Sequence, residues 1–141
     1  MKSNKPKTTR SLLAALALCA GLLGRAEDQP QPIDGVLTFD VPEGAVVRYA
    51  EPLGADIRQL VKLGAGTLVV TNDANGAFLG TVEVRAGVLE AQSALTTTLN
   101  VLGSRAENTI TVSEGAQLLA RVPAGKNQFA QRFPNNLVLA G

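Results

Sequence analysis

A unit centred on glycine recurs along the chain and constrains the fold more than any other feature of the sequence. In each copy an aliphatic residue and two variable residues precede the glycine, and another aliphatic residue follows two or three positions later. The four glycines, Gly44, Gly66, Gly87 and Gly115, lie 22, 21 and 28 residues apart. Glycine accepts a positive φ angle without steric cost, so we expect each of them to turn one strand sharply into the next.

Short segments rich in β-branched residues accompany this unit. They are partly alternating and are bounded by Gly, Asn, Asp or Pro, which is typical of strands. We expect strands at residues 36–39, 45–49, 66–71, 81–84, 109–112 and 137–139. Residues 91–102 are the least strand-like stretch, because Ala91 to Leu95 are also compatible with a turn of helix.

A repeat of twenty-odd residues that contains strands and no helix is typical of a β-solenoid, in which each coil lays its strands on those of the previous coil. The sequence therefore predicts an all-β chain of about four coils. Aromatic residues make up only 4% of the sequence, and a narrow interior favours Val, Leu, Ile and Ala. The alternative is a small antiparallel sandwich or barrel, which would show hairpin turns and no fixed period.

Residues 1–26 have the pattern of a secretory signal peptide. A basic start with Lys2 and Arg10 precedes an uncharged apolar run over 11–24, and Gly24-Arg25-Ala26 has small residues where a signal peptidase would cut. An uncleaved anchor or a buried helix is the alternative, although the run is shorter than the roughly 20 residues that span a bilayer. Cys19 follows Leu18 rather than a small residue, so we do not expect lipid attachment.

The rest of the chain is predicted to consist of a Pro-rich linker at 27–34 and a solenoid at 35–141. Loss of residues 1–26 would leave 8 basic and 12 acidic residues, a net charge of −4 and no cysteine. Disulfides would then be excluded, and the acidic balance argues against nucleic acid or an anionic membrane as partner. The chain has no histidine, which excludes a Ser-His-Asp triad and His-ligated zinc.

The stretch Leu60 to Thr71, which contains Gly64-Ala65-Gly66-Thr67-Leu68, resembles the autotransporter-associated β-strand repeat of bacterial passenger domains. The resemblance continues through the Asn-containing turn at 72–76, the Gly-Thr-x-Val strand at 80–84 and the Ala-Gly-x-Leu close at 86–89, with weaker similarity at 109–119 and 135–141. It covers about residues 60–91 in full.

What the resemblance implies is a right-handed parallel β-helix that is exported and displayed in the envelope or at the surface of a bacterium. It further implies a surface spacer or adhesion scaffold and no catalytic activity. Other envelope or surface proteins, glycans and end-to-end association of solenoids are the expected partners. Such proteins carry a C-terminal membrane barrel, which the sequence up to Gly141 lacks, so we expect another export route or a fragment.

Three features of the sequence resemble parts of known catalytic or ligand-binding motifs. Asn72 to Gly76 resembles part of a calcium loop but lacks suitable ligands at both ends, with Val82 where a bidentate Glu belongs. Gly64-Ala65-Gly66 matches no nucleotide-binding loop. The serines after the signal are Ser93, Ser104 and Ser113, and none lies in a nucleophile motif. The sequence therefore predicts no catalytic residue, metal or cofactor.

A set of acidic residues and a set of basic residues provide candidates for a different hypothesis, a carbohydrate-active β-helix enzyme or a remnant of one. Such an enzyme needs converging carboxylates, or an acid and an arginine, on one face. The candidates are Asp34, Asp40, Glu43 and Glu51 with Arg48, Arg58, Lys62 and Arg85. For Lys62, which recurs in the repeat family, we expect a position on the coil surface that blunts edge pairing. A small periplasmic β-sandwich that binds a ligand is the third hypothesis.

Overall fold

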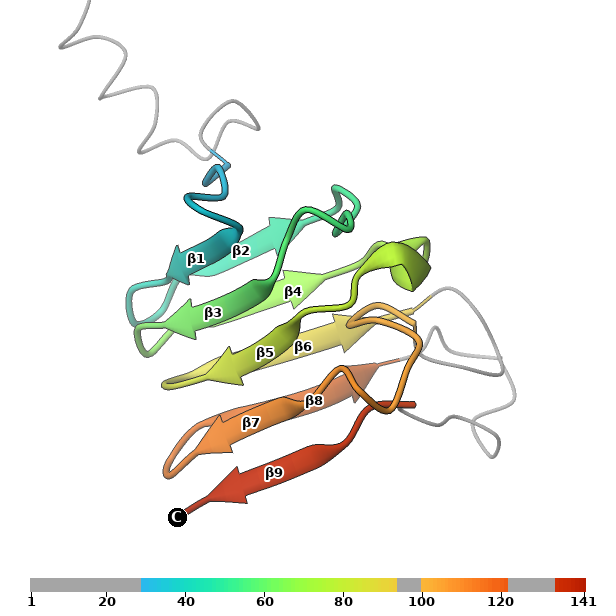
Figure 1. Cartoon of the computed structure of the whole chain (residues 1–141). Helices are drawn as coiled ribbons and strands as arrows, with labels where there is room; N and C mark the ends of the chain where they lie inside the picture. Colours follow the sequence, from blue (N-terminus) through green and yellow to red (C-terminus); the bar gives the residue numbers. More distant parts are fainter. Residues whose placement is uncertain (1–28, 94–99, 122–133) are drawn as a thin grey trace, which may run out of the picture.

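The computed structural model describes residues 29–93, 100–121 and 134–141, and predictions for residues 1–28 fall outside this part of the chain. Its strands form two parallel sheets, one with the order β1-β3-β5-β7-β9 and one with the order β2-β4-β6-β8 (Figure 1). The strands are β1 (Val36–Asp40), β2 (Val46–Tyr49), β3 (Gln59–Leu63), β4 (Thr67–Val70), β5 (Thr81–Val84), β6 (Val88–Gln92), β7 (Ile110–Ser113), β8 (Gln117–Arg121) and β9 (Leu137–Ala140). A short 3₁₀ turn, η2 (Asn75–Ala77), lies between β4 and β5.

The chain winds as a β-solenoid of about four turns. Each coil runs along one sheet, turns tightly, returns along the other sheet and reaches the next coil through a longer connection (Figure 1). All the paired strands are parallel. The all-β solenoid prediction is confirmed, and the antiparallel sandwich is excluded because hairpin pairing would place neighbouring strands antiparallel.

The strand register places similar side chains of successive coils above one another, so that they form columns along the solenoid. Leu37 pairs with Leu60, Leu60 with Val82 and Val82 with Ile110, and all four side chains are at most 1% exposed. A facing column in the other sheet runs through Val47, Leu68, Leu89 and Leu118. One coil cannot bury its own apolar side chains, so each additional coil buries the inward residues of its neighbour, at roughly 1.5–3 kcal/mol per fully buried side chain.

The six predicted strands are all present, but the sequence analysis did not single out β3, β6 or β8 as strands. In β6 the outward position between Leu89 and Ala91 holds Glu90, and in β3 a lysine occupies an inward position. Lys62 therefore interrupts the apolar pattern of β3, whereas β6 alternates regularly but has Val88 as its single β-branched residue, so it lacks the composition on which the prediction depended. Residues 91 and 92 belong to β6, whereas residues 94–99 lie outside the described part of the chain.

The tight turn between β3 and β4 differs from the prediction. Gly64, with φ of 72°, adopts the positive angle there, and Gly66 does not. Gly66 is nevertheless closely surrounded, because a Cβ atom at this position would lie 2.7 Å from the carbonyl oxygen of Ala45 and closer still to that of Pro42. Gly66 therefore allows two coils to approach closely, whereas Gly64 makes the turn.

Candidate functional site

The most unusual buried side chain belongs to Lys62. Its position in β3 pairs with Phe39 in β1 and with Val84 in β5, and its side chain is 0% exposed. The Nζ atom donates hydrogen bonds to the carbonyl oxygens of Leu63 at 2.7 Å, Gly64 at 2.8 Å and Ala86 at 3.2 Å. The predicted surface position is therefore wrong, because an ammonium group with three donors is matched here to backbone acceptors of the tight turns.

Burial lowers the pKa of the Lys62 amine below its usual 10.5, and the nearby Asp40 carboxylate opposes this shift. A lysine with a depressed pKa is a common nucleophile in enzymes that attack carbonyl groups. Here the amine is closed off from solvent and holds backbone carbonyls of two successive coils. Its geometry is that of a turn clamp that ties β3 to the start of the next turn.

Two buried asparagines perform the same task on the opposite, long-turn side of the solenoid. Asn75 accepts a 2.7 Å hydrogen bond from the Leu53 N–H and donates one of 2.6 Å to the Val101 carbonyl. Asn108 donates to the carbonyl oxygens of Phe78 and Gly80 at 3.0 and 2.9 Å. Each amide thus bridges neighbouring coils. The oxygen of Asn75, which the calcium-loop reading requires as a ligand, accepts a backbone hydrogen bond instead.

The acidic residues of the first coil fall into two groups. Asp40 and Glu43 lie at the tight turn, whereas Asp34 and Glu51 lie near the long connection. The length of β1, about 13 Å at 3.3 Å per residue, separates the two ends of the coil. No three acidic or cysteine side chains of the described residues cluster as metal ligands would.

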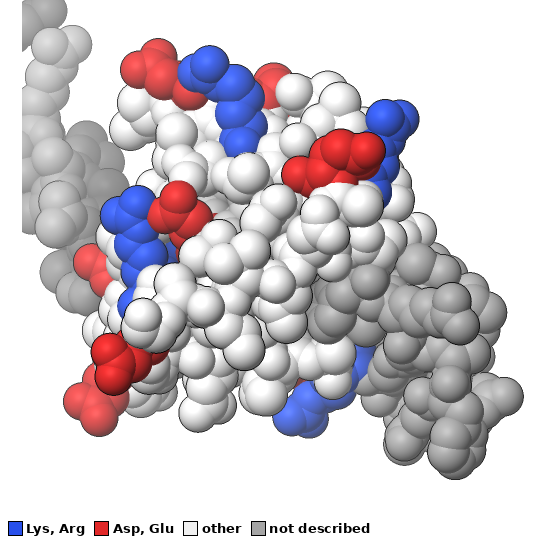
Figure 2. All heavy atoms as spheres, turned by 60° about the horizontal axis from the view of Figure 1, so that its bottom comes forward, with Lys and Arg blue, Asp and Glu red and all other residues white. Residues whose placement is uncertain are grey.

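The arginines named as candidates for a carbohydrate-active site contact other parts of the chain. Arg85 forms a 2.6 Å ion pair with Glu83, and Arg48 donates a 2.7 Å hydrogen bond to Gln92. Arg58 donates to the backbone carbonyl of Asp34. Figure 2 shows the charges of both signs scattered at the margin of the viewed face, with uncharged surface between them.

The serines also lie apart from one another. Ser93, at the end of the β6 coil, is 0% exposed and its hydroxyl donates to the Asp73 carboxylate. Ser113 ends β7, and Ser104 lies in the connection that precedes it. The structure brings none of these serines together with a base in an accessible site.

The two ends of the solenoid differ. At the first coil, Leu37 and Phe39 are at most 3% exposed, and residues 29–33 run beside this end. At the last coil, the inward column positions Leu137 and Leu139 are 55% and 76% exposed. The edges of β8 and β9 there border an apolar groove of about 380 Å³.

Within the described residues, no helix has the length and apolar character needed to cross a membrane.

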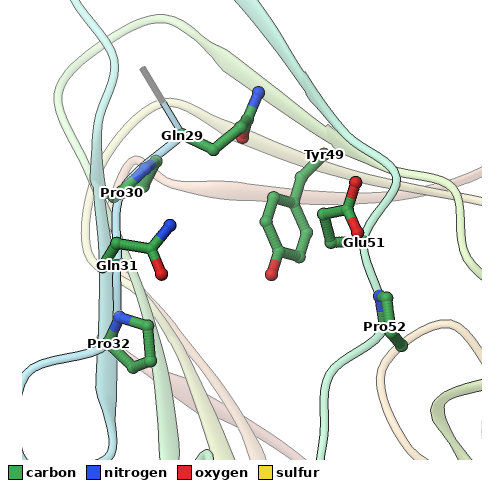
Figure 3. A pocket seen from close by; sticks show the side chains of 7 residues that line it. All are labelled: Gln29, Pro30, Gln31, Pro32, Tyr49, Glu51 and Pro52. Atoms are coloured by element: carbon green, nitrogen blue, oxygen red, sulfur yellow. The ribbon is translucent and has the colours of Figure 1, made fainter. Parts of the chain in front are cut away.

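A pocket of about 400 Å³ lies at the covered end (Figure 3). Gln29, Pro30, Gln31 and Pro32 form one wall, and Tyr49, Glu51 and Pro52 form the other. The Tyr49 ring packs edge-on against Phe39, with 5.1 Å between ring centroids. Burial raises the pKa of the Tyr49 phenol above its usual 10.0, and the Glu51 and Asp56 carboxylates raise it further.

The sequence analysis missed this pocket. It treated residues 27–34 as a linker and saw no role for the single tyrosine of the chain. The signal that could have indicated it is the pairing of a Gln-Pro-Gln-Pro segment with the later Tyr-Ala-Glu-Pro segment, which the first coil brings face to face.

Comparisons with protein-family models, curated proteins and solved structures find no match for this chain. The resemblance to the autotransporter-associated repeat therefore stays a prediction that rests on the residues quoted for it.

Proposed function

We propose that the chain is an exported structural β-solenoid segment of the autotransporter-repeat type, which acts as a surface spacer or adhesion scaffold and carries out no reaction. The observation that carries this proposal is the use of the interior polar groups. The side chains of Lys62, Asn75 and Asn108 all donate hydrogen bonds to backbone carbonyl oxygens of neighbouring turns. Polar groups that are buried and satisfied in this way stiffen a stack, and stiffness is the property that a spacer needs.

End-to-end association belongs to the same proposal. The outer edges of β8 and β9, which pair with no further strand of the described residues, present backbone donors and acceptors together with the aliphatic column positions Leu137 and Leu139. A parallel coil of like pattern placed on this face would continue both sheets, because the strand spacing and the apolar columns already repeat along the solenoid.

Export is tested in a bacterial host. The full chain, tagged at its C-terminus, is expressed, the cells are fractionated and the N-terminal residue of the product is determined. We expect the product in the envelope or the medium, beginning near Glu27. A cytoplasmic product that retains Met1 would contradict export.

Catalysis is tested separately with the purified chain and a set of neutral and acidic polysaccharides. We expect no increase in reducing ends or unsaturated products. Turnover that is lost when Asp40 or Glu51 is changed to the amide would favour the carbohydrate-active enzyme over the scaffold.

A further inference from the structure

The pocket beside the first coil contains polar atoms that the fold leaves without partners. The Gln29 side-chain oxygen is buried and has no hydrogen-bond partner. Tyr49 is only 6% exposed, its hydroxyl points into the pocket (Figure 3), and it makes no hydrogen bond with any described residue. A buried polar group without a hydrogen-bond partner destabilises the fold. The buried Gln29 oxygen therefore favours a ligand that donates a hydrogen bond to it. The Tyr49 hydroxyl, which faces the same pocket, can donate to or accept from that ligand.

The walls of the pocket narrow the chemistry of that ligand. The Gln31 amide and the Glu51 carboxylate reach the same space as the Tyr49 hydroxyl, and the rings of Pro30, Pro32 and Pro52 supply apolar surface (Figure 3). Amides, a phenol and a carboxylate set beside apolar rings suit a molecule whose hydroxyls alternate with C–H faces. A volume of about 400 Å³ lies within the 300–1,000 Å³ range of small-molecule sites.

Charge excludes one class of ligand. Glu51 lines the pocket, and both Glu51 and Asp56 act electrostatically on the Tyr49 phenol. Among the described residues that line the pocket, none is a Lys or an Arg. An anionic ligand such as a uronate or a phosphate would be repelled by these carboxylates, whereas a neutral ligand would not.

We propose that this pocket binds a neutral sugar ring, either as a free mono- or disaccharide or as the terminal residue of a glycan. Gln29 accepts a hydrogen bond from a sugar hydroxyl, the Tyr49 hydroxyl donates to another, and the proline rings pack against the C–H faces. The site does not depend on the proposed scaffold role, because binding here would stand even if the chain were an enzyme.

The composition of the chain provides a direct probe of the site. Tyr49 is the only tyrosine and there is no tryptophan, so the intrinsic tyrosine fluorescence of the purified full chain reports on this pocket alone. The chain is titrated with glucose, galactose, mannose, xylose, lactose and cellobiose. Separate titrations with galacturonate and with calcium chloride test whether an anionic sugar or a cation binds instead. We expect a saturable change in emission with at least one neutral sugar and none with galacturonate or calcium.

Matched variants test the assigned contacts. Gln29→Leu removes the unpartnered oxygen and should weaken sugar binding about tenfold, whereas Gln117→Leu, an exposed glutamine in β8 at the far end, should leave it unchanged. Tyr49→Phe keeps the ring against Phe39 and removes the hydroxyl. It should also weaken binding, measured by shifts of the Gln29 side-chain amide in NMR spectra. Circular dichroism confirms that each variant keeps its β structure.

A glycan array separates the two sources of the ligand. Binding to the array without a response to free sugars identifies a glycan terminus, and a response to free sugars identifies the free form. The proposal is overturned if neither form binds, if only calcium or galacturonate changes the Tyr49 emission, or if Gln29→Leu binds as well as the unaltered chain. Polysaccharide turnover would contradict the scaffold role but not this site, because it is read out by products rather than by reversible binding.

Discussion

At the scale of single residues, a few buried polar side chains interrupt the apolar columns of this solenoid and hydrogen-bond its backbone. Lys62 occupies a column position between Phe39 and Val84. An apolar residue would fit the column, but it would leave the carbonyls of Leu63, Gly64 and Ala86 without the donor that the ammonium group supplies. The structure therefore combines an expensive buried cation with satisfied turns.

The Lys62 amine should give the protein a characteristic dependence of stability on pH. Its folded-state pKa lies below the unfolded value of 10.5, so between these two values the unfolded chain binds more protons than the folded one. The free energy of unfolding should therefore rise as pH increases through this window. Urea unfolding at several pH values below 10 measures this, and Lys62→Met should remove the rise. Parallel curves for the two proteins would contradict the assignment.

Tyr49 should produce the opposite slope at higher pH. Its folded-state pKa lies above the unfolded value of 10.0, so above pH 10.0 the unfolded chain loses a proton that the folded chain keeps. Stability should then fall as pH rises, and Tyr49→Phe should remove this fall. Absorbance of the phenolate in the folded protein checks the direction of the shift, and a midpoint at or below 10.0 would refute it.

Asn75 is expected to matter far more for stability than its neighbour Asn72. Asn75→Ala leaves the Leu53 N–H and the Val101 carbonyl unpaired and should lower the free energy of unfolding by about 2–4 kcal/mol. Asn72→Ala removes bonds to Ala50 and Ala74 near the surface and should cost less than about 1 kcal/mol. Chemical denaturation compares the two. Equal losses would show that burial does not set the difference.

At the scale of elements, the tight turns are the points where each coil is fixed on the next. Gly64 and Gly115 have similar φ angles of 72° and 75°, but only Gly64 is crowded. A Cβ atom at Gly64 would overlap the Val41 carbonyl, whereas at Gly115 nothing lies within 4 Å. Both glycines therefore require a positive φ angle, but only Gly64 is also closely packed against a neighbouring coil.

This difference predicts unequal effects of alanine. Gly115→Ala should cost about 1–2 kcal/mol, the strain of a left-handed alanine. Gly64→Ala should cost at least about 1 kcal/mol more, because the coils must move apart. Thermal and urea unfolding of both variants provide the comparison. A larger loss of unfolding free energy for Gly115→Ala would contradict the closer packing of the turn that contains Gly64.

The elements also show how far sequence reasoning reaches. The period and the strands at 36–39 and 81–84 follow from β-branched residues placed between turn signals, and these survive in the structure. Strand β3 was obscured by Lys62, whose burial depends on carbonyls contributed by a later coil. The roles of Gly64 and Gly66 could not be separated, because crowding at Gly66 comes from Pro42 and Ala45 in the preceding coil. The pocket was missed for the same reason: its walls come from separate segments.

At the scale of the whole molecule, the two ends of the described stack differ in how far their inward side chains are exposed. Residues 29–33 lie beside β1, whereas Leu139 in β9 is 76% exposed although its column is buried elsewhere. The expected end-to-end association therefore uses the face of β8 and β9, where, within the described part of the chain, the exposed aliphatic side chains lie on inward column positions.

We expect the purified 141-residue chain to associate through this face with increasing concentration. Leu139→Lys places a charge on the exposed column and should shift the chain toward monomer, while Glu114→Lys, an exposed change in the preceding turn, should have little effect. Sedimentation velocity over a range of concentrations measures the difference. A chain that is monomeric throughout, or a Leu139→Lys variant that associates equally, would contradict this role of the face.

The stacking of coils is the central claim, and its most direct test is a distance that changes by one coil. Thr38 and Val138 lie in the same outward column, linked through Val61, Glu83 and Thr111. Spin labels on cysteines at these two positions, with Cys19→Ser to remove the native thiol, give a distance by pulsed electron paramagnetic resonance. Duplication of residues 59–80 inserts one coil, because Gln59 pairs with Thr81. The distance should then increase by about 4.8 Å without broadening. An unchanged distance, or a broad distribution, would show that the coils are not stacked in this register.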